Sequence, residues 1–216
     1  MKMARTVVTL AVAALAGMLG EAAAHAQSAV PVEARNIVLV HGAWADGSSW
    51  AEVIPLLQAA GLKVTALVYV AARGPEAGED FVALSGKFPT GPVRAGIQEH
   101  DGFTKLSEES FLKYFANGLD HSKAEVLYAV QEPTAAALFG GRTTAAAWRS
   151  KPSWYAVSKL DQTINPDLER FLAKRMNATT VELNAGHLSL VSHPKEIADM
   201  ILAAAHKKIT AIPASK

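Results

Sequence analysis

The sequence predicts an α/β fold in which a mostly parallel sheet is flanked by helices. Strand, helix and strand patterns follow one another over residues 36–72, and the alternation resumes at residue 153. This order gives parallel strands joined by right-handed crossovers. Between them, residues 73–151 place recurrent Gly and Pro among short helical patterns, which indicates an insertion. We therefore expect one domain, residues 27–216, with a helical lid insertion at about residues 73–151.

The first predicted unit begins with a continuous apolar run, NIVLV at residues 36–40, as in a strand covered on both faces. After the loop HGAWADGS, Ser49 and Glu52 have the spacing of a capping box. The following helix is expected to end at Gly61, a favourable residue for a helix C-terminus. Pro55 lies inside this run, so the pattern predicts a kink in its first turns.

The second strand pattern is unusually long. Residues 63–72 read KVTALVYVAA, ten residues without a helix or strand breaker. A strand is usually about 5–6 residues long, so this run is nearly twice the normal length.

The insertion contains three helical patterns: EDFVALSGKF, SEESFLKYFANGL and SKAEVLYAVQ. Ser107 is a plausible cap for the second, and either Asp120 or Ser122 for the third. We expect helices here rather than strands. The simpler interpretation is a helical subdomain packed on the surface, and the more specific one is a lid over a site.

The last third of the chain returns to strand and helix. SWYAVSKL at residues 153–160 reads as a strand, and an Asn-Pro pair at residues 165–166 begins a helix. TTVELN at residues 179–184 is another strand, and a final helix starts near His-Pro at residues 193–194.

The first 26 residues are typical of a cleaved export signal. Lys2 and Arg5 form a basic start, residues 6–20 are apolar, and Ala-His-Ala precedes an expected cleavage before Gln27. A transmembrane anchor is the alternative, but an apolar run of about 15 residues is short for a span of about 20. We therefore expect an exported protein, periplasmic or secreted.

Charge and cysteine content exclude several classes of protein. Removing the signal takes away two basic residues and one acidic residue, which leaves 19 of each. A net charge of zero does not favour nucleic acid or, after signal cleavage, a membrane surface. Without cysteine there is no disulfide and no thiol nucleophile. No dinucleotide, Walker A or zinc-binding motif is present, so we expect no cofactor and no metal.

Three polar stretches follow predicted strands. His-Gly-Ala-Trp at residues 41–44 follows the first strand, Asp161 follows residues 153–160, and His187 follows residues 179–184. The carboxyl ends of parallel strands share one edge of a sheet, where ligands bind. An Asp there can fix the tautomer of a His, and a glycine-containing loop can turn N–H groups toward an oxyanion. These are two thirds of a hydrolase site.

The segments IVLVHGAWADGSSWAEVIPLLQAAGLKV, LVYVAARGPEAGEDF, SWYAVSKLDQTINPDLERFLAKRM and VELNAGHLSLVSHPKEIADMI carry a family resemblance. Over nearly all of residues 36–206 the chain resembles the α/β-hydrolase superfamily, most closely its small esterase and hydroxynitrile-lyase-like branch. The resemblance implies Asp161 as the triad acid, His187 as the general base and the Ala43 N–H as an oxyanion donor. Three neighbours in the same loop are expected to line the substrate site: His41, Gly42 and Trp44.

One part of the family pattern is missing. The nucleophile should lie in a G-x-S-x-G elbow, but no serine here has glycines at both −2 and +2. In the family, a strand like KVTA leads through a helix, the elbow strand and a second helix to a strand like LVYVAA. Here KVTA runs directly into LVYVAA, so the long strand resembles two family strands joined, with about 40–50 residues absent. Ser48 or Ser49 could substitute only by hydrogen-bonding the base.

Two functions follow from this pattern. The first is hydrolysis of small carboxylic esters, the ancestral Ser-His-Asp chemistry, impaired here without its nucleophile. The alternative is a non-catalytic pseudoenzyme or deletion product that binds a small apolar ligand under the lid. The sequence does not fix an oligomeric state. Five aromatic residues of the insertion would line such a pocket, although residues at helical spacing are more often ordinary core: Phe81, Phe88, Phe111, Tyr114 and Phe115.

Overall fold

A computed structural model describes residues 39–40, 42–45, 47–59 and 67–205. The chain forms two units, Met1–Val32 and Glu33–Lys216, and every described residue belongs to the second. The predicted export signal therefore lies outside the described residues and stays a prediction.

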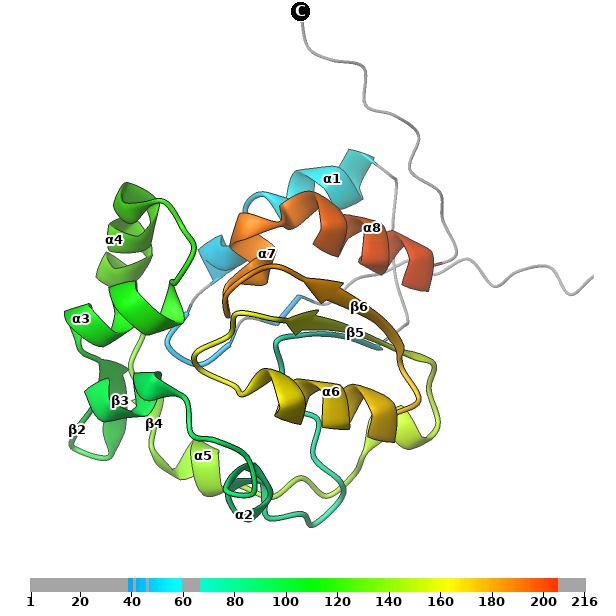
Figure 1. Cartoon of the computed structure of the whole chain (residues 1–216), viewed down its shortest axis with the longest axis horizontal. Coiled ribbons are helices and arrows are strands. Elements are labelled where there is room, and N and C mark those ends of the chain that lie inside the picture. The colour runs from blue at the N-terminus through cyan, green and yellow to red at the C-terminus, as the bar shows by residue number, and fades with distance from the viewer. Residues whose placement is uncertain (1–38, 41, 46, 60–66, 206–216) are drawn as a thin grey trace, which may run out of the picture. The chain divides into compact units, whose positions relative to one another are not determined.

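The second unit contains a parallel three-stranded sheet (Figure 1). Its strands are β1 (Leu67–Val70), β5 (Ser153–Ser158) and β6 (Thr179–Leu183), in the order β1-β5-β6. β5 is paired on both edges, with Tyr155 opposite Tyr69 of β1 on one side. The strands predicted at residues 153–160 and 179–184 are confirmed.

Helices cover both faces of this sheet. α6 (Pro166–Arg175) lies on one face, and α1 (Val53–Ala59) and α8 (Pro194–Ala204) lie on the other (Figure 1). A short helix, α7 (Ser189–Ser192), precedes α8. The Asn165 side chain accepts a hydrogen bond from the Asp167 N–H at 2.9 Å, so the predicted cap of α6 is confirmed.

The alternation of side chains along β5 divides the core into two clusters. Tyr155 and Val157 pack with Leu172 of α6, whereas Ala156 between them packs with Ile197 of α8. All five of these side chains are completely inaccessible to solvent. Successive residues of a strand point to opposite faces, so a strand covered on both faces must be apolar throughout.

The predicted capping box at Ser49 is wrong. Residues Gly47–Trp50 form a 3₁₀ turn, and α1 begins only at Val53. Pro55 explains the later start, because a proline ring clashes with the carbonyl four residues earlier, here that of Ala51. Pro55 thus lies in the first turn of α1, where its missing N–H costs no helical hydrogen bond and no kink is needed.

Two strand predictions fall partly outside the described residues. Of the run at residues 36–40, only Leu39 and Val40 are described, and neither belongs to a strand. Of the long run at residues 63–72, the structure describes only the part from Leu67 onward, where β1 begins. The joining of two family strands stays a prediction.

The insertion contains the helices that the sequence predicts, in short pieces. Ser107 caps the second helical pattern and Asp120 the third, through hydrogen bonds from the Ser110 and Lys123 N–H groups. The elements are α2 (Phe81–Ser85), a 3₁₀ turn (Pro92–Gly96), α3 (Glu108–Ser110), a π-helical turn (Phe111–Phe115), α4 (His121–Ala129), α5 (Ala137–Gly140) and a 3₁₀ turn (Ala147–Arg149).

A small antiparallel sheet corrects the expectation of an all-helical insertion. Its strands are β2 (Ile97–His100), β3 (Phe103–Leu106) and β4 (Thr134–Ala135). Asp101 and Gly102 join β2 to β3 with φ angles of +49° and +78°. An Asp-Gly pair is a favourable two-residue hairpin turn, because glycine accepts a positive φ without strain.

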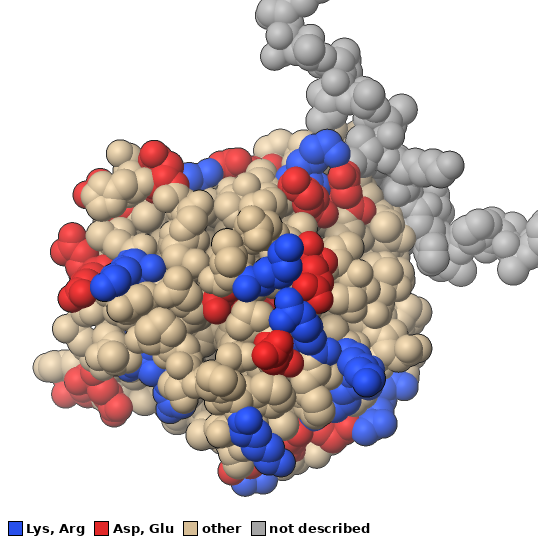
Figure 2. Space-filling view, viewed as in Figure 1, with Lys and Arg blue, Asp and Glu red and all other residues tan. Residues whose placement is uncertain are grey.

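Charged side chains of both signs are interspersed on the face shown in Figure 2. No single sign dominates that face, in keeping with the balanced composition. Within the described ranges, no helix is long and apolar enough to cross a bilayer. The same ranges contain no group of three or more His, Asp or Glu side chains suited to a metal ion.

Candidate active site

The structure brings Asp161 and His187 together. Asp161 follows β5 and His187 follows β6, and these strands are parallel neighbours whose carboxyl ends lie at the same edge. His187 Nδ1 lies 2.6 Å from Asp161 Oδ2. The Asp161 side chain is completely buried, and that of His187 is 13% exposed. The ring thus keeps one accessible side while its partner is shielded from water.

The Asp161 carboxylate is held by its own turn. Its Oδ1 accepts hydrogen bonds from the Thr163 and Ile164 N–H groups at 2.6 and 2.9 Å. This leaves Oδ2 for His187, which donates from Nδ1. A histidine that donates from Nδ1 presents a bare Nε2, the arrangement that a general base requires.

A second carboxyl group, Glu169 of α6, lies close to this pair. Its Oε2 accepts the Ser158 N–H at 3.0 Å, and its side chain is completely buried. Its Oε1 has no hydrogen-bond partner among the described residues that meets the usual geometry. Burial, and then the negative charge of Asp161, raise the pKa of Glu169 to about 10. Glu169 is therefore a neutral carboxylic acid at pH 7.

Sequence reasoning did not single out Glu169, although a signal was present. Glu169 stands three and four residues before Leu172 and Ala173, on the buried face of α6. A glutamate at apolar helical spacing must be paired or neutralised when that face is buried.

Gly186, next to His187, is closely packed. A Cβ built at this position would collide with the backbone carbonyl and the side chain of Asn117. Asn117 is itself fixed, because its Nδ2 donates to the Leu160 carbonyl at 2.9 Å. The loops after β5 and β6 and the segment after Phe115 therefore meet where only glycine fits.

Gly186→Ala should lower the free energy of unfolding by about 1–3 kcal/mol, because the backbone carbonyl of Asn117 must move. Urea denaturation at pH 7 measures this change. Gly140→Ala is the matched control, since a Cβ there meets nothing within 4 Å. Equal midpoints for the two variants would contradict the prediction.

Hydrogen bonds of Trp44 attach the loop predicted to hold an oxyanion to the insertion. Trp44 has a left-handed backbone, φ +59°, and its N–H donates to Thr134 Oγ1 at 3.1 Å. Its indole Nε1 donates to Thr104 Oγ1, also at 3.1 Å. No described residue accepts the Ala43 N–H, which keeps this group available for a ligand. Its role as an oxyanion donor stays a prediction, and His41 lies outside the described residues.

The oxyanion loop and His187 line one cavity of about 700 Å³. Gly42, Ala43, Trp44 and His187 all line it. This volume is ordinary for a small-molecule site, about 300–1,000 Å³.

The insertion contributes fewer aromatic residues to this cavity than expected. Of the five named from the sequence, Phe81 and Phe115 line it. Phe88, Phe111 and Tyr114 do not, and for these three the prediction is wrong. Phe111 is 1% exposed and packs in the core, and the ring of Phe88 packs against Phe171 at 5.8 Å.

Two serines, Ser49 and Ser85, also line the cavity. The Ser85 hydroxyl donates to the Val82 carbonyl at 2.9 Å, within its own helix. Ser49 is buried in the 3₁₀ turn before α1. Among the described residues, His187 makes its side-chain hydrogen bond only with Asp161. The described site thus has an acid and a base but no hydroxyl bonded to that base.

Comparisons with known proteins agree on the fold. A model described as the alpha/beta hydrolase family matches residues 53–200. Among solved structures, the pyrethroid hydrolase PytH is 16% identical, with a TM-score of 0.62 over 80% of this chain and 98% of that chain. Polyneuridine aldehyde esterase is 13% identical, with a TM-score of 0.56 over 81% of this chain and 73% of that chain.

A methylesterase from Arabidopsis is 14% identical, with a TM-score of 0.53 over 83% of this chain and 72% of that chain. No curated protein matches the chain. At such identities the solved structures establish the likeness of fold alone. Together with the family match, they confirm the fold class predicted from the sequence.

Proposed function

Because the chain belongs to the alpha/beta hydrolase family, we propose that its cavity binds small carboxylic esters and that their hydrolysis is strongly impaired. The observation that carries this proposal is the Asp161–His187 hydrogen bond of 2.6 Å beside a cavity of about 700 Å³. The similar structures include a pyrethroid hydrolase and a methylesterase, which supports the ester as the ligand class.

The parts present can perform some steps of ester hydrolysis and not others. His187 can accept a proton at Nε2, Asp161 stabilises the imidazolium that forms, and the Ala43 N–H can bind the developing oxyanion. Attack on the carbonyl needs a hydroxyl bonded to the base. When the nucleophile is removed from a serine hydrolase, roughly 10³–10⁴-fold acceleration over water is all that remains. We expect turnover at or below that level.

Binding without any turnover is the second candidate. It is favoured by the lack of a described hydroxyl bonded to the base, because neither Ser49 nor Ser85 is hydrogen-bonded to His187. We also propose that the protein acts outside the cytoplasm after loss of residues 1–26, which is supported by the basic start, apolar run and cleavage pattern of that segment.

An intact mass of the purified mature protein, before and after treatment with a fluorophosphonate, tests the proposal. We expect an unlabelled chain that begins at Gln27. A labelled chain of that size would contradict the missing nucleophile. Ser49→Ala and Ser85→Ala would then show which hydroxyl reacts, each serving as the control for the other. A chain heavier than the full 216 residues would mean that a segment absent from this sequence supplies the nucleophile, and the proposal of impaired hydrolysis would fail.

A further inference from the structure

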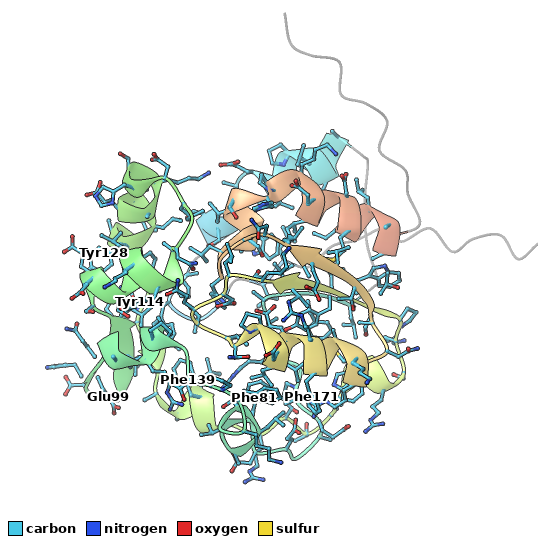
Figure 3. The ribbon with its side chains drawn as sticks, viewed as in Figure 1. Phe81, Glu99, Tyr114, Tyr128, Phe139 and Phe171 are labelled. Carbon is cyan, nitrogen blue, oxygen red and sulfur yellow. The ribbon has the colours of Figure 1, made fainter. Side chains whose placement is uncertain are left out.

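Two arginines line the same cavity as His187: Arg73, which follows β1, and Arg94, in the 3₁₀ turn before β2. Arg73 is half-buried between two rings, with its Cζ 4.6 Å from the centre of Phe81 and 5.7 Å from that of Phe139. Figure 3 shows Phe81 and Phe139, on α2 and α5. The Arg73 Nη1 and Nη2 groups donate only long bonds of 3.4 Å, both to the Phe139 carbonyl.

Neither arginine has a carboxylate partner within the described part of the chain. Of the six arginines described there, the other four form ion pairs: Arg142, Arg149, Arg170 and Arg175. Glu99 also lines the cavity but forms no ion pair with Arg73 or Arg94. The two unpaired guanidinium groups are thus the two that face the cavity.

The pKa shift of Arg73 agrees with a positive charge that no acidic group neutralises. Burial, and then the charge of Arg94, lower the pKa of Arg73, and no acidic group acts in the opposite direction. A guanidinium stays protonated even when its pKa is lowered, so the charge persists inside the cavity. A partly desolvated cation with open donors attracts an anion, and a carboxylate matches the planar geometry of arginine.

Aromatic rings connect this cationic end to the base. The His187 ring lies 5.0 Å from Phe115, and Phe115 lies 6.2 Å from Trp44. Trp44 stacks on Phe139 at 5.1 Å, and Phe139 contacts Arg73. All of these residues line the cavity. A ligand that spans from His187 to Arg73 must therefore have an apolar body.

We propose that the cavity binds a small molecule with an aromatic or apolar body and a carboxylate, the carboxylate being held by Arg73 and Arg94. The body lies along Trp44, Phe115 and Phe139. The carboxylate belongs either to a free acid or to a half-ester whose ester group faces His187. The half-ester alternative rests on the proposed ester-binding function, whereas the free acid does not.

Calorimetric titration with four probes tests the proposal. The probes are 3-phenylpropanoate, its neutral amide, the monomethyl ester of 1,4-phenylenediacetate and the corresponding dimethyl ester. In the wild type we expect each anion to bind about tenfold more tightly than its neutral counterpart, the scale of a hydrogen bond to a charged group. Both Arg73→Met and Arg94→Gln should reduce this preference to less than about threefold, with amide affinity nearly unchanged. Arg170→Gln is the matched control, because that arginine pairs with Glu182 elsewhere.

Each outcome decides a different point. Equal binding of anions and neutral probes in the wild type, or an unchanged preference in both cavity variants, would overturn the cationic site. If 3-phenylpropanoate binds more tightly than its amide and neither ester binds, the ester-binding proposal fails and the cationic site stands. Binding of 3-phenylpropanoate without the half-ester would identify a free acid as the ligand. If Arg73→Met unfolds, the exposed Arg94 provides the test through Arg94→Gln.

Discussion

Glu169→Gln should remove a large pH dependence from the stability of this protein. Burial raises the pKa of Glu169 to about 10 in the folded chain, against 4.5 for an unperturbed glutamate. Between these values the folded state holds a proton that the unfolded state has lost. The stabilisation is therefore complete below pH 4.5 and is lost progressively as the pH rises to the folded pKa near 10. Between these two pKa values, the contribution of Glu169 to the free energy of unfolding falls by about 1.4 kcal/mol per pH unit.

Glutamine preserves the shape of the neutral acid and does not titrate. The stability of Glu169→Gln relative to the wild type should thus rise by about 4 kcal/mol from roughly pH 5.5 to 8.5. Urea unfolding at several pH values in that window measures the difference, in which the other titrating groups largely cancel. Measurements continued above pH 10 report the folded pKa as the pH at which the difference stops growing.

Glu182→Gln is the matched control for Glu169→Gln. Glu182 lies on β6 and its pKa is lowered, chiefly by its hydrogen bonds with Arg170. The stabilisation by Glu182 is thus present above its unfolded pKa and is lost as the pH falls through its lowered folded pKa. The stability of Glu182→Gln relative to the wild type should therefore not rise with pH above about pH 5.5. A constant difference between wild type and Glu169→Gln across the window would show that Glu169 ionises normally.

The elements after residue 153 follow local rules closely enough to be predicted. The run at β5 is apolar throughout, and Asn165 and Pro166 fix the start of α6 by a side-chain cap and a preset φ. The meeting of Asp161 and His187 follows from strand order, because adjacent parallel strands place their following loops together.

Other features depend on contacts that a local pattern does not contain. At Ser49, a cap signal competes with the Pro55 ring, and the steric clash decides. The hairpin at Asp101 and Gly102 carried a turn signal, but its strands β2 and β3 are only four residues long each, too short to show a clear alternation. Arg73 acquires its position only when helices α2 and α5 enclose it. Which aromatic residues face a cavity depends on this same packing, so the sequence placed three of five incorrectly.

Asp161→Ala should be the most destabilising change at the candidate active site and should lower the free energy of unfolding by about 3–5 kcal/mol. Three hydrogen bonds end on this carboxylate: from the Thr163 N–H, the Ile164 N–H and His187 Nδ1. Its side chain is completely buried, so water cannot replace the lost acceptor cheaply. His187→Ala removes a single hydrogen bond and should cost less, about 1–2 kcal/mol.

Urea unfolding of Asp161→Ala and His187→Ala at pH 7 measures this contrast, with Asp161→Asn as the variant that keeps one acceptor oxygen. Equal losses for the alanine variants would show that the bond between the two residues, rather than the turn around Asp161, carries the stability. A larger loss for Asp161→Ala would give this carboxylate a structural role that does not depend on turnover. An acid that folds the turn after β5 is needed even in a chain without a nucleophile, whereas a base that serves only catalysis is not.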